Sequence, residues 1–223
     1  MTNRETMQAL TSPNRLHGAI ESCFPGERIR KLWRIDTLGG QAYLMLLSQS
    51  TPELDTVCRQ FAPPGEGWES RPYDALLNRI EPYGVWRFRL TANPTKSLHN
   101  DNGRGRVCAH ITVAHQKEWL MERSERGGFL LKEDEFDVVH SQWLRFRKGT
   151  EGGRPVTLLS VTYEGILTVS DAESFKRTLT QGIGRGRAYG MGMMTVIKGM
   201  SPWSRFQASP DPSFRLCRRL KTG

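Results

Sequence analysis

The chain has 223 residues, enough for one large domain or two modest ones. Thirty-two lysines and arginines against 23 aspartates and glutamates leave a formal charge of +9, which favours a polyanionic partner such as nucleic acid. No apolar run approaches the roughly 20 residues of a membrane span, and residues 1–10 show no signal-peptide core, so we expect a cytoplasmic protein without a membrane partner. Four scattered cysteines form no C-x-x-C pair, which argues against a zinc knuckle or a disulfide framework.

The first predicted element is a helix that starts at Pro13, with Ser12 as its capping residue and Pro25 as its stop. Its apolar residues recur with the i, i+3, i+4, i+7, i+8 spacing of a single buried face. They are Leu16, Ala19, Ile20, Cys23 and Phe24. His17 falls at the edge of this stripe, so its side chain should be rooted in the core and tipped toward solvent.

Two strands, 30–36 and 41–48, follow the helix and are joined by a hairpin turn at 37–40. A short helix over 73–80 and a strand over 85–92 come next. The order helix, strand, strand, helix, strand is that of a ferredoxin-like βαββαβ unit without its opening strand. We assign residues 1–92 to this N-terminal domain.

The segment 93–106 is rich in glycine, asparagine and basic residues and has no periodicity, so we expect it to connect two domains. A second βαββαβ order follows, and we assign residues 107–200 to it. Its predicted elements are strand 106–111, helix 113–126, strands 138–147 and 156–169, a helix from a capping box at 170–173 to Gln181, and strand 191–198. The predicted fold is therefore α+β, with two tandem ferredoxin-like domains and a basic, mobile tail over 201–223.

Between the last predicted helix and strand, residues 182–192 contain five glycines and two arginines, Arg185 and Arg187. A dinucleotide site would need the glycines to follow a strand and open a helix, which is the reverse of the order here, so no nucleotide cofactor is expected. Two interpretations stay open. The segment either offers backbone N–H groups and arginines to phosphates, or is a packed connection.

Metal-binding patterns are missing from the sequence. The histidines form no H-x-x-x-H pair and no HExxH motif, and the carboxylates do not cluster, so neither a metal nor any other cofactor is expected. His17 is open to a catalytic or a structural interpretation. Basic residues gather in the second half of the chain and favour a groove for RNA.

Four motifs in order resemble the CasE family, the repeat-processing endoribonucleases of type I-E CRISPR systems. They are residues 15–18 (RLHG) with 24–25 (FP), residues 87–96 (RFRLTANPTK), residues 161–169 (VTYEGILTV), and the glycine segment 182–192. The resemblance implies two ferredoxin-like domains of the RAMP type and metal-independent cleavage at the 3′ base of a CRISPR repeat hairpin. It also implies that the product stays bound and that the protein becomes a subunit of the Cascade complex.

Within this resemblance, His17 matches the family's catalytic histidine, and the strand that ends at Lys148 matches part of the hairpin that engages the RNA stem. The candidate RNA-binding residues are Arg15, Lys96, Arg104, Arg106, Arg145, Arg147, Lys148, Gly184, Arg185, Gly186 and Arg187. The alternative is a non-catalytic RNA-binding scaffold in which His17 only packs. Family members often carry tyrosine three residues before the histidine, whereas this chain has Asn14, which questions any tyrosine-assisted step.

Overall fold

The computed structural model describes residues 12–24, 26, 29–62, 67–100, 103–148 and 153–199. It contains two units with separate hydrophobic cores. The smaller core lies among the N-terminal elements and the larger among those that follow residue 73. The two tandem ferredoxin-like units expected from the sequence are confirmed, with changes in which strand belongs to which unit.

The second unit is a complete βαββαβ fold built on a curled antiparallel sheet. Its elements are β3 (Val85–Ala92), α5 (Val113–Ser124), β7 (Phe136–Arg147), β8 (Pro155–Val169), α6 (Ala172–Gln181) and β9 (Met194–Lys198). The strands lie in the order β9, β3, β8, β7, with the two-residue strand β6 (Phe129–Leu130) pairing with the far end of β8. Alternate residues of β3 are buried in the core with aromatic and aliphatic side chains of α5 and α6.

The position of β3 corrects the expected domain boundary. Residues 85–92 were assigned to the first unit, but all eight pair with β8, and five of them also pair with β9. The reason is the apolar face of the strand, because Trp86, Phe88 and Leu90 fill the larger core. The boundary therefore falls before Val85 rather than at residue 92.

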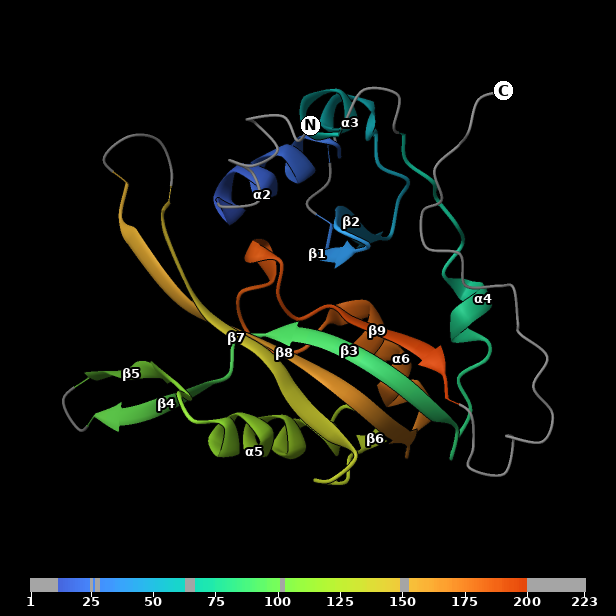
Figure 1. Cartoon of the computed structure of the whole chain (residues 1–223), viewed down its shortest axis with the longest axis vertical. Coiled ribbons are helices and arrows are strands. Elements are labelled where there is room, and N and C mark those ends of the chain that lie inside the picture. The colour runs from blue at the N-terminus through green and yellow to red at the C-terminus, as the bar shows by residue number, and fades with distance from the viewer. Residues whose placement is uncertain are drawn as a thin grey trace.

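The expected connection over 93–106 is also different in the structure. It contains β4 (Thr95–Asn100) and the start of β5 (Gly103–Ala109), which pair with each other as a separate hairpin. The strand expected over 106–111 therefore does not open the second sheet, since β3 already occupies that place. Figure 1 shows this hairpin extending to one side of the sheet, next to α5.

The first unit contains α2 (Pro13–Ser22), β1 (Lys31–Leu38), β2 (Gln41–Ser48) and α3 (Asp55–Phe61). Helix α3 was not predicted; its Val57 is buried in the smaller core. The predicted helix over 73–80 exists as the short α4 (Asp74–Leu77), but Leu76 and Leu77 pack against the core of the second unit. Two predictions, the missing opening strand and the mobile tail over 201–223, fall on residues 1–11 and 200–223, which lie outside the described residues.

Two capping predictions need correction. Ser12 occupies the N-cap of α2, yet its side chain makes no capping hydrogen bond, and Pro13 begins the helix as expected. Helix α6 is capped by Asp171 rather than by Ser170. The Asp171 carboxylate accepts hydrogen bonds from the Ser174 hydroxyl and from the Glu173 backbone N–H, and the bond from Ser174 is the main cause of the lowered pKa of Asp171.

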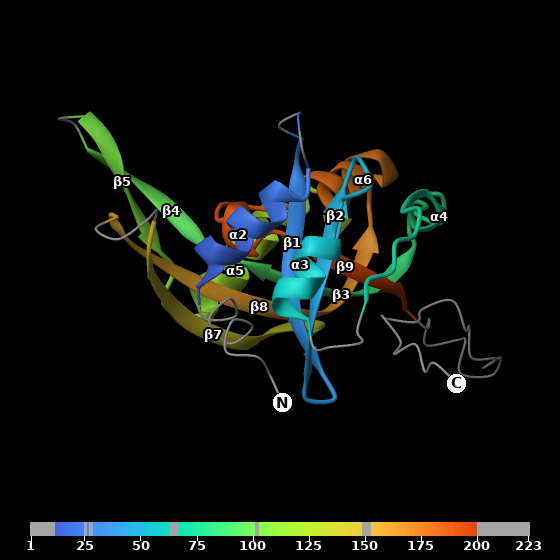
Figure 2. The same ribbon diagram turned by 90° about the horizontal axis from the view of Figure 1, so that it is seen from above.

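The first unit lies on the open face of the larger sheet. Helices α2 and α3 cover the outer face of the β1–β2 hairpin, as Figure 1 shows, and β1 and β2 run across the strands of the larger sheet in Figure 2. Alternate side chains of β1 lie on opposite faces of the strand, one face toward the smaller core and the other toward the second unit. Leu32 lies within contact distance of Gly182 in the glycine segment of the second unit. Trp33 packs into the smaller core, and its ring also lies against Gly190 of that segment.

Arg34 is the main polar link between the units and is only 2% exposed. Its Nη1 donates hydrogen bonds to the carbonyl oxygens of Arg89 and Met193, both at 3.0 Å. Its Nη2 donates to the Thr195 hydroxyl at 2.8 Å and to Asp36 at 2.7 Å, and Nε also donates to Asp36. One buried guanidinium thus uses its fixed set of donors to join β1 to β3 and β9.

Replacing Arg34 by methionine should lower the free energy of unfolding by about 3 kcal/mol, because two carbonyls lose their buried donor and Asp36 loses its main partner. Urea denaturation measures the change. The matched control is Arg71→Met, since Arg71 makes an exposed ion pair of 2.6 Å with Glu69, and its loss should cost less than about 1 kcal/mol. Equal effects of the two substitutions would show that Arg34 does not hold the units together.

Candidate active site and RNA interface

Helix α2 holds His17 at the junction of the two units. Leu16 and Ile20 anchor the helix in the smaller core, and the His17 side chain next to them is 34% exposed. This confirms the expected placement of the imidazole, rooted beside the core and open to solvent. The helix contacts both the glycine segment and β7, so His17 faces the second unit rather than bulk solvent alone.

The glycine segment 182–192 forms a compact loop between α6 and β9, with a short 3₁₀ turn η1 (Arg187–Tyr189). All five of its glycines have φ between 76° and 87°, the left-handed region that favours glycine. The backbone N–H of Gly192 donates to the Thr91 carbonyl of β3 at 2.6 Å, and that of Ile183 donates to Gly192 at 2.9 Å. The backbone of the loop therefore lies directly against the backbone of β3.

Tyr189, at the end of η1, connects the loop to the other parts of the site. Its ring meets the His17 imidazole edge-on, with ring centroids 6.3 Å apart and an angle of 67° between the planes. On another side it contacts Phe146 of β7, with centroids 4.7 Å apart. The sequence prediction did not select Tyr189, although a lone aromatic residue among five glycines is a signal that could have drawn attention to it.

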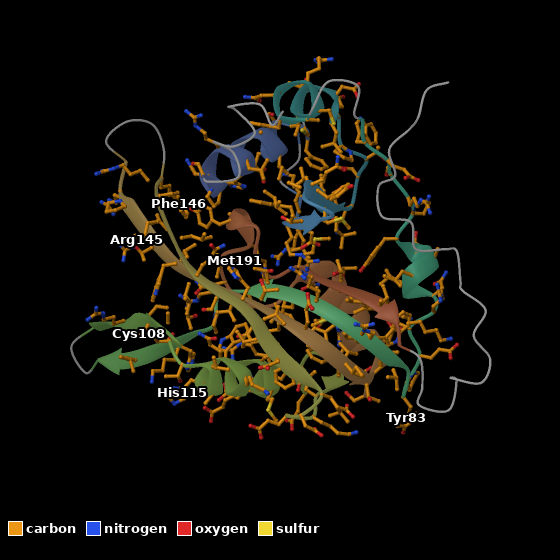
Figure 3. The ribbon with its side chains drawn as sticks, viewed as in Figure 1. Tyr83, Cys108, His115, Arg145, Phe146 and Met191 are labelled. Carbon is orange, nitrogen blue, oxygen red and sulfur yellow. The ribbon has the colours of Figure 1, made fainter. Side chains whose placement is uncertain are left out.

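Strands β7 and β8 extend beyond the sheet as a twisted arm that rises beside α2 (Figure 1). Near its end Arg145, Phe146 and Arg147 pair with residues 157, 156 and 155 of β8, so the predicted hairpin strand is confirmed. Figure 3 labels Arg145 and Phe146 on this arm. Arg145, Arg147 and Lys148 are exposed, while Phe146 is half-buried against Tyr189. The arm therefore carries cationic side chains next to the aromatic contact with His17.

A second cationic group lies around a cavity of about 330 Å³ between β4, α5 and the glycine loop. Lys96, His110 and Arg185 line it, together with Trp119 and the Glu122–Arg123 pair. Burial, followed by the charge of Lys96, lowers the pKa of His110 below its ordinary value. Gly184 also lines the cavity, and a side chain there would press against the Trp119 ring, so close packing accounts for this glycine.

Arg187 points to a different place from Arg185. Its Nη2 donates a hydrogen bond of 3.2 Å to the Gly182 carbonyl, and its Nε is buried without a hydrogen-bond partner among the described residues. Burial, and next the charge of Arg30, lower the pKa of Arg187. Arg185, in contrast, is exposed. Arg185 is therefore exposed to solvent, whereas Arg187 is held against the backbone of its own loop.

The remaining candidate residues are dispersed. Arg15 is exposed on α2, two residues before His17, and Arg106 is exposed on β5. Arg104 also lies on β5, but its side chain is outside the described set. Gly186 takes a left-handed conformation at the start of η1. Among the residues that the structure describes, no three His, Cys, Asp or Glu side chains gather to hold a metal ion.

The described helices are all too short or too polar to cross a membrane. The three cysteines within the described ranges are free thiols, and Cys23 is buried in the smaller core. Burial, and then the neighbouring Cys58, raise the pKa of the Cys23 thiol. This environment makes Cys23 a packing residue rather than a reactive one.

Fold and site together define a tandem ferredoxin-like protein with a histidine at the junction of its two units. The family described as CRISPR associated protein matches residues 1–198. The CRISPR-associated endoribonuclease Cse3 of Thermus thermophilus is 31% identical over 210 residues, covering 87% of this chain and 94% of the relative.

Solved structures give the same result. A structure of CRISPR endoribonuclease Cse3 bound to a 19-nucleotide RNA matches with a TM-score of 0.71 and 28% identity, over 87% of this chain and 93% of that one. Thermus thermophilus Cse3 bound to an RNA that represents a pre-cleavage complex matches with a TM-score of 0.70 and 26% identity over the same shares. The chain belongs to the CRISPR-associated CasE (Cse3) family.

The different positions of the two loop arginines predict different consequences of their loss. Arg185→Ala should weaken binding of a structured RNA and reduce the salt dependence of binding by up to about one unit of slope, because an exposed arginine can neutralise a phosphate. Arg187→Ala should chiefly destabilise the loop. Binding titrations over a range of salt concentrations, with thermal melts of both variants, separate the two effects.

An Arg185→Ala protein with an unchanged salt slope would remove this side chain from the RNA interface. If Arg187→Ala reduced the slope without lowering the melting temperature, the inward position of Arg187 would not describe the RNA-bound protein.

Proposed function

We propose that the chain is a metal-independent endoribonuclease that binds CRISPR repeat hairpins in precursor RNA and cleaves at the 3′ base of the stem. The mature guide RNA then stays bound, and the protein acts as a subunit of the Cascade complex. Support comes from Cse3, which is named an endoribonuclease and has been solved with bound RNA. The observation that carries the proposal is the half-exposed imidazole of His17 beside the basic β7–β8 arm.

His17 supplies proton transfer to a reaction whose nucleophile is already part of the RNA. The 2′-OH attacks the adjacent phosphate, the bond to the 5′-oxygen breaks, and a 2′,3′-cyclic phosphate or its 3′-phosphate hydrolysis product remains. An imidazole suits this step because its ordinary pKa near 6.5 lets it accept or donate a proton at neutral pH. The protein's further task is to hold the 2′-oxygen in line with the scissile phosphate.

The cationic side chains supply binding. Arg145, Arg147 and Lys148 lie along an extended arm, an arrangement that can follow the phosphates of one strand of a stem. Shape and phosphate contacts dominate such binding because the deep major groove of A-form RNA excludes side chains. Lys96 and Arg185 form a second contact region at the cavity beside β4.

Cleavage should proceed at the same rate in excess EDTA and in Mg²⁺, because the 2′-OH and the His17 imidazole provide nucleophile and proton transfer. Single-turnover assays on the repeat RNA of the host measure this. A rate that falls with chelation and returns with Mg²⁺ would contradict the metal-independent mechanism.

His17→Ala should slow single-turnover cleavage by about 100-fold or more, the usual contribution of general acid–base catalysis, while affinity for the hairpin stays within a few-fold of the parent. Helix α2 keeps its buried anchors Leu16 and Ile20, so the fold should persist, and a thermal melt checks this. If His17→Ala still cut the bound hairpin at the parental rate, His17 would be a packing residue and another group would move the proton. If the parent protein bound the hairpin but produced no cut RNA, the chain would be a non-catalytic scaffold.

A further inference from the structure

Glu21 lies one helical turn after His17 on α2, and its carboxylate faces the His17 imidazole. Its Oε1 is 3.8 Å from His17 Nδ1, which is longer than a hydrogen bond but within the range of an ion pair. The other carboxylate oxygen, Oε2, accepts a hydrogen bond of 2.6 Å from the ammonium group of Lys31 on β1. The carboxylate therefore lies between the imidazole and the Lys31 ammonium group.

Lys31 fixes Glu21 in this position. The Lys31 side chain is only 3% exposed, and its ammonium group lies 4.8 Å from the centre of the Phe24 ring. A buried ammonium without a carboxylate partner would be costly, so Lys31 holds Glu21 strongly although 43% of the Glu21 side chain is exposed. This anchoring distinguishes Glu21 from an ordinary surface carboxylate, whose side chain is free to leave its partner.

Tyr189 restrains the imidazole from a different direction. Its ring edge contacts His17, its ring packs against Phe146, and its backbone N–H donates to the Gly186 carbonyl at 2.8 Å. No hydrogen bond joins the Tyr189 hydroxyl to another described residue, so it is the ring that makes the contact. The imidazole thus stands between an anchored carboxylate and an anchored aromatic ring.

We propose that Glu21, held by Lys31, and Tyr189, held by Phe146, are positioning residues that orient the His17 imidazole for cleavage. The inference rests on the proposed function of His17. With Nδ1 facing Glu21, the other nitrogen, Nε2, is left for the RNA. Positive charge that develops on the imidazole during cleavage then lies near the Glu21 carboxylate, 3.8 Å away, which attracts it.

A double-mutant cycle tests whether Glu21 acts through His17. Glu21→Gln keeps the size of the side chain and an oxygen for Lys31 but removes the negative charge. It should slow single-turnover cleavage by about 10-fold when His17 is present and by less than about 2-fold in the His17→Ala background, since contacting residues are not additive. Affinity for the hairpin should be unchanged in both. The matched control is Glu173→Gln, which removes a helix-surface carboxylate paired with Lys176 at 2.8 Å on α6, and it should leave the rate unchanged.

Two substitutions test the ring of Tyr189. Tyr189→Phe keeps the edge contact and should cleave within about 2-fold of the parent, whereas Tyr189→Leu keeps apolar packing against Phe146 and should slow cleavage by about 10-fold. In the His17→Ala background the leucine substitution should have no further effect. Thermal melts establish that each variant is folded.

The outcomes separate this inference from the proposed function. A slow His17→Ala protein combined with no effect of Glu21→Gln and Tyr189→Leu, or with equal effects in both backgrounds, would overturn the positioning roles and leave His17 catalytic. A phenylalanine variant as slow as the leucine variant would overturn the role of the ring and assign the chemistry to the hydroxyl. Cleavage by His17→Ala at the parental rate would reject the catalytic histidine and the positioning roles together.

Discussion

The buried guanidinium of Arg34 is the interaction on which the site depends most. Arg34 fills one inward position of β1 and donates to backbone oxygens of β3 and β9, so the first unit can lie on the larger sheet in only one register. A shift by one residue would place an apolar side chain against those carbonyls and bury the arginine in the smaller core. Because α2 packs on the other side of β1, this register also determines where His17 meets Tyr189.

The elements of the fold were largely predictable, but their partners were not. Periodicity placed α2, β3, β7, β8 and α6 close to their observed bounds. The alternation of Trp86, Phe88 and Leu90 shows that β3 has a buried face, yet cannot say which of two cores receives it. The β4–β5 hairpin was not predicted because its glycine, asparagine and basic residues are equally typical of a connection. The two segments are strands because they pair with each other.

The residues of the site also fall into two groups: those that the local sequence pattern can predict, and those that only tertiary contacts bring to His17. His17 was identified from its place at the edge of a helical stripe and from a family motif, and its observed exposure agrees with that place. Glu21 shares its helix and could have been found from the i, i+4 spacing. Tyr189 stands out as a lone aromatic residue among glycines, but its contacts with His17 and Phe146 could not be predicted, because 172 residues separate Tyr189 from His17 and 129 separate Phe146 from His17. Only the packing of α2 against η1 and the arm brings them together.

In the proposed reaction the RNA's own 2′-hydroxyl is the nucleophile and His17 moves the proton. The most direct test is a repeat hairpin with a single 2′-deoxy substitution at the nucleotide 5′ to the scissile phosphate. We expect this RNA to bind with the affinity of the unmodified hairpin and to remain uncut under single-turnover conditions, because the nucleophile is missing. Cleavage of the substituted RNA at the parental rate would mean that water is the nucleophile, and would contradict the mechanism.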